Sequence, residues 1–358
     1  MLISKSNNRS FEVQEITVKS PKVSIIVLNW NGRDDTLECL SSIRQIDYPN
    51  FNVVVVDNGS SDDSVSTIRK SFPEVVVLEN GENLGFSRGN NVGIRYAMEH
   101  DADYLFLLNN DTVVDSGLIR YFLEASERIG QEAILGAQIY YYSEPYKIWY
   151  AGARWISELQ QFYHTGQGHI DDGKEFTSLS ETDYVCGCAL LVSAPLLRQI
   201  GLLDEDFFLT FEETDLCYRA RRAGHKSYIV PQAKVWHKVS TSFGGERSPM
   251  WSYFLMRNRL LWARKNLSLS RRLVLYKRVS FELLRYYLPP RFHLKNSSGE
   301  ETLRAVIYRS FIDYIKDFQN VFMEKFNNPA RKARLWAVRD YLLHRFGNCP
   351  DDVRTLGK

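Results

Sequence analysis

The sequence lacks the features that mark membrane-spanning, secreted or disulfide-stapled proteins. Its longest apolar runs, such as residues 23–28 and 53–56, are far shorter than the roughly 20 residues needed to cross a bilayer. The first twenty residues hold no apolar stretch of the kind found in a secretory signal. There are only five cysteines, an odd number without paired spacing, which suits a reducing compartment. These absences predict a cytoplasmic protein.

The chain also lacks an even distribution of charge. The overall net charge is only +2, but residues 251–346 hold 20 Lys or Arg and 7 Asp or Glu, a surplus of +13. The remainder of the chain must therefore carry −11. A basic, aromatic-rich segment favours contact with a polyanion, either nucleic acid or an anionic membrane surface, although a solvated helical face explains it equally well. Because no nucleic-acid-reading motif accompanies the charge, we expect no nucleic acid partner.

A glycine-rich phosphate turn is missing as well. The first expected strand, residues 22–30, runs into Asn-Gly-Arg-Asp and not into G-x-G-x-x-G. This absence argues against a nicotinamide-linked dehydrogenase, which would otherwise share the sheet architecture expected below.

The sequence does contain a regular alternation of buried strands and helices. With 358 residues, of which 44% are hydrophobic, the chain can bury a substantial core. Continuous apolar segments predict strands at residues 22–30, 52–57, 75–80 and 103–112. Helical spacing of apolar residues falls between them, at 35–43, 64–72 and 85–100. This order predicts an α/β fold with a parallel sheet and helices on its faces.

Polar side chains follow three of the expected strands at the point where each strand ends. They are Asn29 and Asn31 in NWNG, Asp57 in DNGSSDD, and Asn109, Asn110 and Asp111 in NND. Turns are the ordinary use of Asn and Asp at such places. Because the carboxyl ends of parallel strands meet at one edge of a sheet, and ligands bind in the crevice there, a common pocket is the stronger interpretation.

Seven motifs in this order resemble family 2 of the inverting glycosyltransferases, and most closely its rhamnosyltransferase-like bacterial members. They are VSIIVLNWNG, VVVDNGSSDDS, ENLGFSRGNNVGI, FLLNNDT, GCALLV, LDEDFFLTFEETDLCYRARRAG and VWHKVSTS. The resemblance covers about residues 21–265 and fades beyond them. It implies the GT-A fold of nucleotide-diphospho-sugar transferases and a single displacement that inverts the anomeric centre.

The resemblance, composition and charge together predict a division of the chain. A polar leader, residues 1–20, precedes a nucleotide-sugar-binding half at 21–115. An acceptor-binding and catalytic half follows at 116–250, in which residues 116–182 are expected to form short strands and loops over a cleft. Residues 251–358 form a basic region that is expected to be mainly helical.

A divalent cation, Mg²⁺ or Mn²⁺, is implied as the cofactor, because it neutralises the charge that develops on the departing diphosphate. Asp111 and His237 occupy the family's ligand positions. Asn109 stands where the family often has a carboxylate. It either coordinates through its carbonyl oxygen or holds the ribose, and it adds no charge.

The remaining donor contacts follow from the same motifs. Asp57 resembles the residue that accepts hydrogen bonds from the base or the ribose, although a turn with Gly59 explains it too. Asn29, Asn31 and Asn110 belong to the same edge. For Arg88 and Asn91 in GFSRGNN we expect contact with the diphosphate or the base, with a loop-holding role for Asn91 equally open.

The FEETD motif supplies candidates for the general base that deprotonates the acceptor hydroxyl. The family motif is usually Glu followed by Asp, with the second acid as base. Here the second acid is Glu213, one methylene longer, and Glu212 is the neighbouring candidate. Asp215 is expected to cap the helix or to pair with an arginine.

Taken together, these residues predict metal-dependent transfer of a sugar to a hydroxyl of a glycan or a lipid-linked acceptor in cell-surface polysaccharide synthesis. A thymidine-linked deoxysugar such as rhamnose is the expected donor, with a uridine-linked sugar as the alternative. A catalytically silent nucleotide-sugar-binding protein is the competing hypothesis. The basic region predicts peripheral binding to the inner face of the cytoplasmic membrane. The sequence leaves the oligomeric state open, including a homo-oligomer.

Overall fold

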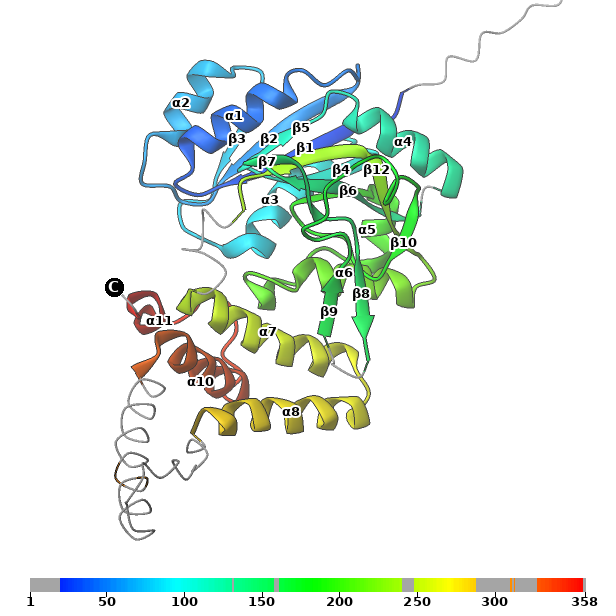
Figure 1. The fold of residues 1–358 in the computed structure, drawn as a ribbon. Helices are drawn as coiled ribbons and strands as arrows, with labels where there is room; N and C mark the ends of the chain where they lie inside the picture. Colours follow the sequence, from blue (N-terminus) through cyan, green and yellow to red (C-terminus); the bar gives the residue numbers. More distant parts are fainter. Residues whose placement is uncertain are drawn as a thin grey trace, which may run out of the picture.

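A computed structural model describes residues 20–130, 132–157, 161–239, 248–287, 310, 312 and 327–356. It has an α/β body with a group of helices beneath it (Figure 1). The polar leader, apart from residue 20, lies outside the described residues.

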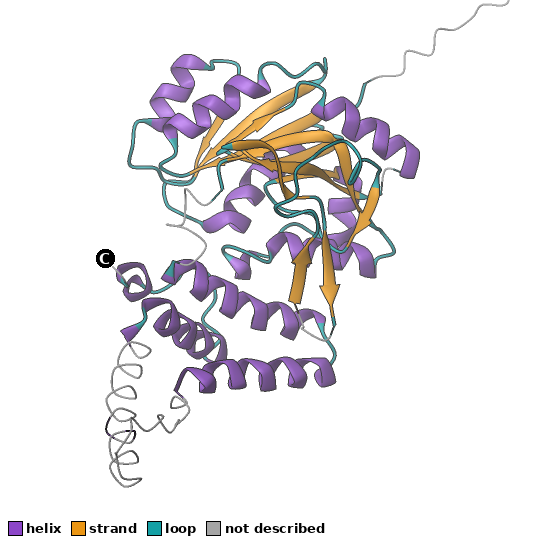
Figure 2. Ribbon diagram, viewed as in Figure 1, coloured by secondary structure: helices purple, strands orange, loops and turns teal. Residues whose placement is uncertain are grey.

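Four parallel strands form one half of the central sheet. Their order is β3 (Val76–Glu79), β2 (Phe51–Asp57), β1 (Val23–Asn29) and β4 (Tyr104–Asn109). The strands of this half are rich in Val, Ile and Leu, and β1 and β4 are buried on both faces, as expected for parallel strands covered by helices. Helices α1 (Arg33–Ile43) and α2 (Ser64–Ser71) lie on one face and α3 (Gly85–Glu99) on the other (Figure 2). The strands and helices predicted before residue 112 are confirmed.

The other half of the sheet is mixed in direction. Strand β11 (Ala189–Ser193) runs antiparallel between β4 and β6 (Ile134–Tyr141), and β12 (Ser227–His237) pairs parallel with β6. Strands β5 (Thr112–Val114), β7 (Glu144–Tyr150) and β10 (Ser180–Thr182) complete it. The hairpin β8 (Ala153–Ile156) with β9 (Gln161–His164) forms a separate two-stranded sheet. The connecting helices are α4 (Leu118–Ile129), α5 (Ala194–Ile200), the 3₁₀ turn η1 (Glu205–Phe207) and α6 (Glu212–Arg222).

The described part of the basic region is helical, as predicted. Helix α7 (Pro249–Asn266) begins at a Ser248 cap with Pro249 in its first turn, and α8 (Leu269–Tyr287) follows it. Helix α10 (Pro329–Leu342) packs against α7, and α11 (Asp351–Thr355) ends the described chain. None of the helices in the described ranges is long and apolar enough to cross a bilayer.

The described residues form two large hydrophobic cores and a small cluster of Tyr140, Ile148 and Ala151. The larger core lies around the sheet. The second core joins α7, α8, α10 and α11 to Phe207 at the end of η1. The segment that follows Phe207 therefore lies where the helical region (residues 248–287 and 327–356) meets the body (residues 20–239).

Candidate active site

A cleft of about 690 Å³ opens beyond the carboxyl ends of β1, β2 and β4, between the body and helices α7 and α11. The register of the strands explains its position. Asn29 pairs with Asp57, and Leu28 pairs with Asn109, so the three polar strand ends meet at one edge of the sheet. The expectation that they share one edge is confirmed.

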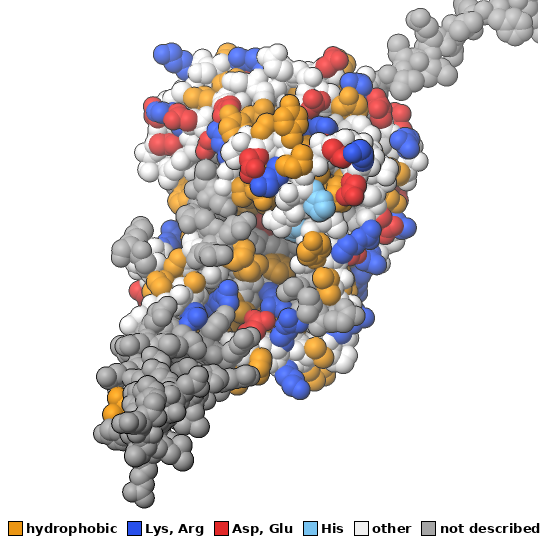
Figure 3. Space-filling model, viewed as in Figure 1, with side chains coloured by type: hydrophobic (Ala, Val, Ile, Leu, Met, Phe, Trp, Pro, Cys, Tyr) orange, Lys and Arg blue, Asp and Glu red, His pale blue; other side chains and the backbone are white. Residues whose placement is uncertain are grey.

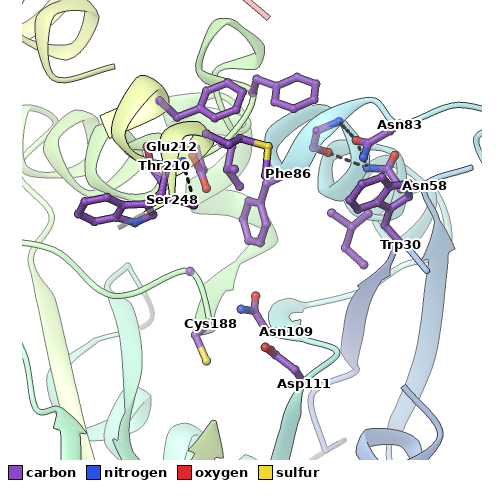
Figure 4. A pocket seen from close by; sticks show the side chains of 18 of the residues that line it. Trp30, Asn58, Asn83, Phe86, Asn109, Asp111, Cys188, Thr210, Glu212 and Ser248 are labelled. Atoms are coloured by element: carbon purple, nitrogen blue, oxygen red, sulfur yellow. Dashed lines mark hydrogen bonds between the residues drawn. The ribbon is translucent and has the colours of Figure 1, made fainter. Parts of the chain in front are cut away.

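Figure 4 shows three groups of side chains around the cavity. Asn109, Asp111 and Cys188 lie together, Thr210, Glu212 and Ser248 form a second group, and Trp30, Asn58 and Asn83 form a third.

Asp111 and His237 converge on the cleft from different parts of the chain. Thr112, next to Asp111, pairs with His237 across β5 and β12, and this pairing brings the two side chains together. Nε2 of His237 lies 3.1 Å from Oδ1 of Asp111, and the two residues are only 7% and 5% exposed. The indole of Trp149 packs edge-on against the His237 ring, with centroids 5.0 Å apart, and fixes its orientation.

A carboxylate oxygen beside an imidazole nitrogen is a donor set that suits Mg²⁺ or, more readily, Mn²⁺. Within the described ranges, no third His, Cys, Asp or Glu joins the pair to make a cluster of three ligands. A cation there would take its other ligands from water, from the diphosphate oxygens or from the Asn109 carbonyl, which also lines the cleft. The residues present therefore fit the cofactor that the motifs imply.

Glu212 and Glu213 start helix α6 and both line the cleft. Glu212 is 4% exposed, and burial together with the charge of Glu213 raises its pKa well above the ordinary range. Burial also raises the pKa of Glu213, to about 7, although the backbone amides of Glu213, Thr214 and Gly187 favour its ionised form. At neutral pH the pair can therefore hold one proton on Glu212 while Glu213 accepts another.

Asn29 and Asp57 form a buried hydrogen-bond network behind the cleft. Asn29 Nδ2 donates to Asp57 Oδ1 (2.8 Å), and its Oδ1 accepts from Thr36 Oγ1 (2.8 Å). Asp57 also accepts from the Ser60 hydroxyl (2.6 Å) and the Ser60 amide (2.9 Å). Asn110 joins through a 3.0 Å bond from Nδ2 to Thr36 Oγ1 and itself lines the cleft. This network ties the ends of β1, β2 and β4 together.

Like Asn29 and Asp57, three further predicted donor-binding residues are not part of the cleft wall. Asn31 is exposed, and its Oδ1 accepts from the Ser61 amide (2.7 Å). Asn91 is buried and holds both the amide and the carbonyl of Leu203. The Arg88 guanidinium lies 3.7 Å from the Glu205 carboxylate and is largely exposed. The loop-holding alternative for Asn91 matches this geometry. Asp215 was expected either to cap the helix or to pair with an arginine, and it pairs with Arg219 at 2.7 Å.

The structure adds cleft residues that sequence reasoning missed. Trp30 directly follows β1 and is 41% exposed, and Asn58 directly follows the predicted Asp57. Both adjoin strand ends that the motifs had already marked, so their positions carried a usable signal. No sequence signal marked the residues that the helical region adds to the cleft wall. They are Met250, Trp251, Phe254, Asn348, Val353, Arg354 and Leu356.

The family model described as Glycosyl transferase family 2 matches residues 24–192. A hexosyltransferase of low-salt glycan biosynthesis from Haloferax volcanii is 30% identical over 203 residues, 56% of this chain and 62% of that protein. The chain thus spans less than two thirds of that relative. A dTDP-rhamnosyl transferase from Shigella flexneri is 26% identical over 261 residues, covering 67% and 79%. An N-acetylglucosaminyl-diphospho-decaprenol L-rhamnosyltransferase from Mycobacterium tuberculosis is 28% identical over 212 residues, covering 54% and 68%.

Two solved structures share the fold. A mannosyltransferase from Pyrobaculum calidifontis, in complex with GDP-Man and Mn²⁺, has a TM-score of 0.53 at 13% identity and covers 92% of this chain and 89% of that one. GalNAc-T7, with UDP, GalNAc and Mn²⁺, has a TM-score of 0.51 at 15% identity, covering 60% and 43%. The GT-A fold expected from the motifs is confirmed.

Proposed function

We propose that the chain, whose residues 24–192 match the Glycosyl transferase family 2 model, transfers a sugar from a nucleotide diphosphate to a hydroxyl with inversion, using Mg²⁺ or Mn²⁺. The proposed donor is a thymidine-linked deoxysugar such as rhamnose, with a uridine-linked sugar as the alternative. The proposed acceptor is a glycan or lipid-linked glycan of a cell-surface polysaccharide. The names of the bacterial relatives support both choices.

The observation that carries the proposal is the pairing of two chemically different groups in one cleft. Asp111 and His237, with Asn109, would hold the cation, which when bound neutralises the charge of the leaving diphosphate. The carboxylates of buried Glu212 and half-buried Glu213 line the same cavity. A metal ligand pair and a base of raised pKa in one cavity are what transfer to a hydroxyl requires.

Glu213 is the proposed base. Its pKa of about 7 lets it exist as a carboxylate at neutral pH and still take the acceptor proton readily. Burial and the charge of Glu213 both raise the pKa of Glu212, which favours a protonated Glu212 and spares the site a second negative charge.

The third group of cleft residues is proposed to receive the nucleoside. Trp30 presents a partly exposed ring on which a base can stack. Asn58 Nδ2 donates to Asn83 Oδ1 at 3.1 Å, and this bond fixes the orientation of both side-chain amides next to Trp30. Asn29 and Asp57 would act from behind this wall by fixing the strand ends. Direct donor contacts by Asn31, Arg88 or Asn91 would require a rearrangement of their present bonds.

The wall from the helical region is proposed to receive the acceptor. It is mostly apolar, with the Arg354 guanidinium among Trp251, Phe254, Val353 and Leu356. An apolar surface with one cation suits an amphiphilic molecule that carries phosphate, such as a lipid-diphosphate-linked glycan.

Peripheral membrane binding is proposed through the outer face of α8. Leu273, Val274, Phe281 and Leu284 are exposed there at helical spacing, with exposed Lys277 among them. On the face shown in Figure 3, Lys and Arg outnumber Asp and Glu over the helical region, whereas both signs mix over the body. Apolar and cationic side chains on one helix face are typical of helices that lie in a membrane interface.

A screen of nucleotide sugars with and without Mn²⁺ or Mg²⁺ tests the proposal. Metal-dependent donor binding by calorimetry, together with metal-dependent release of the nucleoside diphosphate, is the expected result. Binding without any turnover, with or without a glycan acceptor, would support the catalytically silent alternative. Absence of binding to every nucleotide sugar would overturn both.

A further inference from the structure

The loop that leads into the glutamate pair has a backbone that ordinary residues rarely adopt. Its φ angles are +56° at Phe208, +67° at Thr210 and +75° at Phe211. Left-handed backbone at non-glycine residues persists only where the surrounding structure enforces it. Three such residues within four positions therefore need support from outside the loop.

One side chain of α7 supplies most of that support. Asn258 Nδ2 lies 2.7 Å from the carbonyl oxygen of Phe207, 2.6 Å from that of Leu209 and 2.9 Å from that of Thr210. The carbonyl between them, on Phe208, accepts from the Phe86 amide at 2.6 Å. All four carbonyls of residues 207–210 thus lie within hydrogen-bond distance of groups outside the loop, and the two amide hydrogens of Asn258 are shared among three of them.

The body side of the loop is fixed as tightly. Gly85, at the start of α3, has a φ of +80°, and a Cβ there would lie 2.6 Å from both the ring and the carbonyl oxygen of Phe208. The loop is therefore confined between α3 and α7, and only α7 contributes a side-chain donor to its carbonyls among the described residues.

Asn258 is itself oriented by Arg257. Arg257 Nε donates to Asn258 Oδ1 at 3.0 Å, which points the Asn258 amide nitrogen at the loop. Both residues are completely buried. The guanidinium also donates to the carbonyls of Gly347 (2.6 Å) and Phe207 (3.1 Å). A buried guanidinium is costly unless it is hydrogen-bonded, so this arrangement commits the helical region to one position relative to the loop.

We propose that Asn258 is a positioning residue for Glu212 and Glu213. By holding the carbonyls of residues 207, 209 and 210, it fixes where α6 begins and so directs both carboxylates into the cleft. Thr210, whose carbonyl it holds, also lines the cleft, and the Thr210 hydroxyl is buried without a hydrogen-bond partner in the described chain. The inference rests on the roles proposed above for the two glutamates.

The main test compares Asn258→Ala with a matched control on the same helix. Asn266 donates to Asp215 Oδ1 (2.8 Å) on α6, so Asn266→Ala removes one amide that joins α7 to the body and leaves the loop carbonyls alone. We expect Asn258→Ala to lower kcat by about 10- to 100-fold, because a misplaced catalytic group costs rate, with donor Kd within about twofold. Asn266→Ala should keep kcat within about threefold. Equal losses in both variants would reduce Asn258 to a link between two cores.

A double variant tests whether Asn258 acts through Glu213. Adding Asn258→Ala to Glu213→Gln should lower kcat by less than about threefold further, because the group that Asn258 positions is already disabled. Full multiplication of the two losses would overturn the proposal. Asn258→Ser, which keeps one hydroxyl donor, should fall between wild type and Asn258→Ala, and it replaces the alanine variant if the latter fails to fold by circular dichroism.

A measurement that needs no turnover separates this inference from the proposed function. The titratable groups that interact with Glu213 are Glu212, Tyr184, Cys186 and Cys217. In protein labelled with ¹³C at glutamate carboxyls, NMR should show one glutamate titrating near pH 7, assigned with Glu213→Gln. In Asn258→Ala that titration should move toward the ordinary range, since a displaced carboxylate gains water. An unmoved titration would overturn the positioning role, whereas a wild type without transferase activity would overturn only the proposed function.

Discussion

The two walls of the cleft are built in different ways. The body places its groups by sheet register: Asp111, Asn109 and Trp30 stand where strands stop, and their mutual positions follow from strand pairing. The helical region places its groups by packing of a second core, through buried Asn258 and Arg257. The body therefore supplies the reacting groups, whereas the helical region determines how the loop before Glu212 is held.

The largest effect is expected from removing the base on the body side. Glu213→Gln keeps the size of the side chain and removes the proton acceptor. It should lower turnover by about 10² to 10⁴ while donor affinity stays close to wild type. Steady-state kinetics and calorimetry measure the two quantities. If Glu212→Gln shows the larger loss, the roles of the two glutamates are exchanged.

The metal ligands should give the next largest effect, and on binding. Asp111→Ala and His237→Ala should each weaken metal-dependent donor binding by about 10- to 100-fold and leave metal-independent binding of the nucleotide largely unchanged. Calorimetric titration of the donor at fixed Mn²⁺ measures this. His225→Ala, outside the cleft lining, is the control. A normal metal dependence in His237→Ala would remove that residue from the site.

Substitutions in the helical wall should mainly lower the free energy of unfolding. Arg257→Met removes the donors that hold Gly347 and Phe207, and it should lower the free energy of unfolding by about 3 kcal/mol because buried carbonyls lose their partners. Urea denaturation measures it. Arg271→Met, on the exposed face of α8, should change stability by less than about 0.5 kcal/mol. Comparable small effects in both would show that the second core does not depend on the buried guanidinium.

The raised pKa of Glu213 predicts that the ionised carboxylate lowers the free energy of unfolding as the pH rises. The folded chain keeps the Glu213 proton up to about pH 7, whereas a model carboxyl releases it near 4.5. The folded state therefore binds more protons between these values, and its stability is full below pH 4.5 and falls as pH rises to 7. The shift corresponds to at most about 3 kcal/mol, which partial exposure reduces to roughly 2 kcal/mol.

Glu213→Gln should consequently be more stable than wild type by roughly 2 kcal/mol at pH 8 and equal to it at pH 4. Urea denaturation at both pH values decides. A gain of the same size at pH 4 would show that packing, not ionisation, is responsible.

The smallest effects per residue concern the membrane. Each cation near an anionic surface contributes about 1 kcal/mol, so Arg271→Gln with Lys277→Gln should weaken binding to anionic vesicles by about 20- to 30-fold at low salt. Flotation measures it. Lys174→Gln, an exposed cation on the body, should change nothing. Equal partitioning of wild type at low and high salt would remove the electrostatic contribution altogether.

Much of the body wall was predictable because parallel strands converge by geometry. If DYLFLLNNDT forms a buried strand parallel to KVSIIVLNW, Asp111 must lie at the same end of the sheet as Asn29, where β1 ends. The pairing with His237 came from the family motifs, since nothing local connects residues 126 positions apart. The contact of Arg88 was harder to predict. Its position near the start of α3 suggests a phosphate contact, but its guanidinium lies near Glu205, a carboxylate far along the chain.

The helical wall was not predictable, for a physical reason. The importance of Asn258 lies in three backbone carbonyls some fifty residues earlier, in a loop whose left-handed residues carry no signature in Phe-Leu-Thr-Phe. Charge and periodicity predicted helices with a basic surface, and both are present. They could not predict that α11 lines the cleft, because five residues at the end of a chain carry too little pattern.

The closeness of α11 to the cleft has a practical consequence for handling the protein. Arg354 and Leu356 line the cavity, so an affinity tag or fluorescent fusion joined shortly after Leu356 would start next to the cavity wall. Strand β1 begins at Val23, at the edge of the sheet opposite the cleft. A tag on the amino-terminal side is therefore the better choice for kinetics, and a carboxyl-terminal tag should be removed before the activity of any preparation is judged.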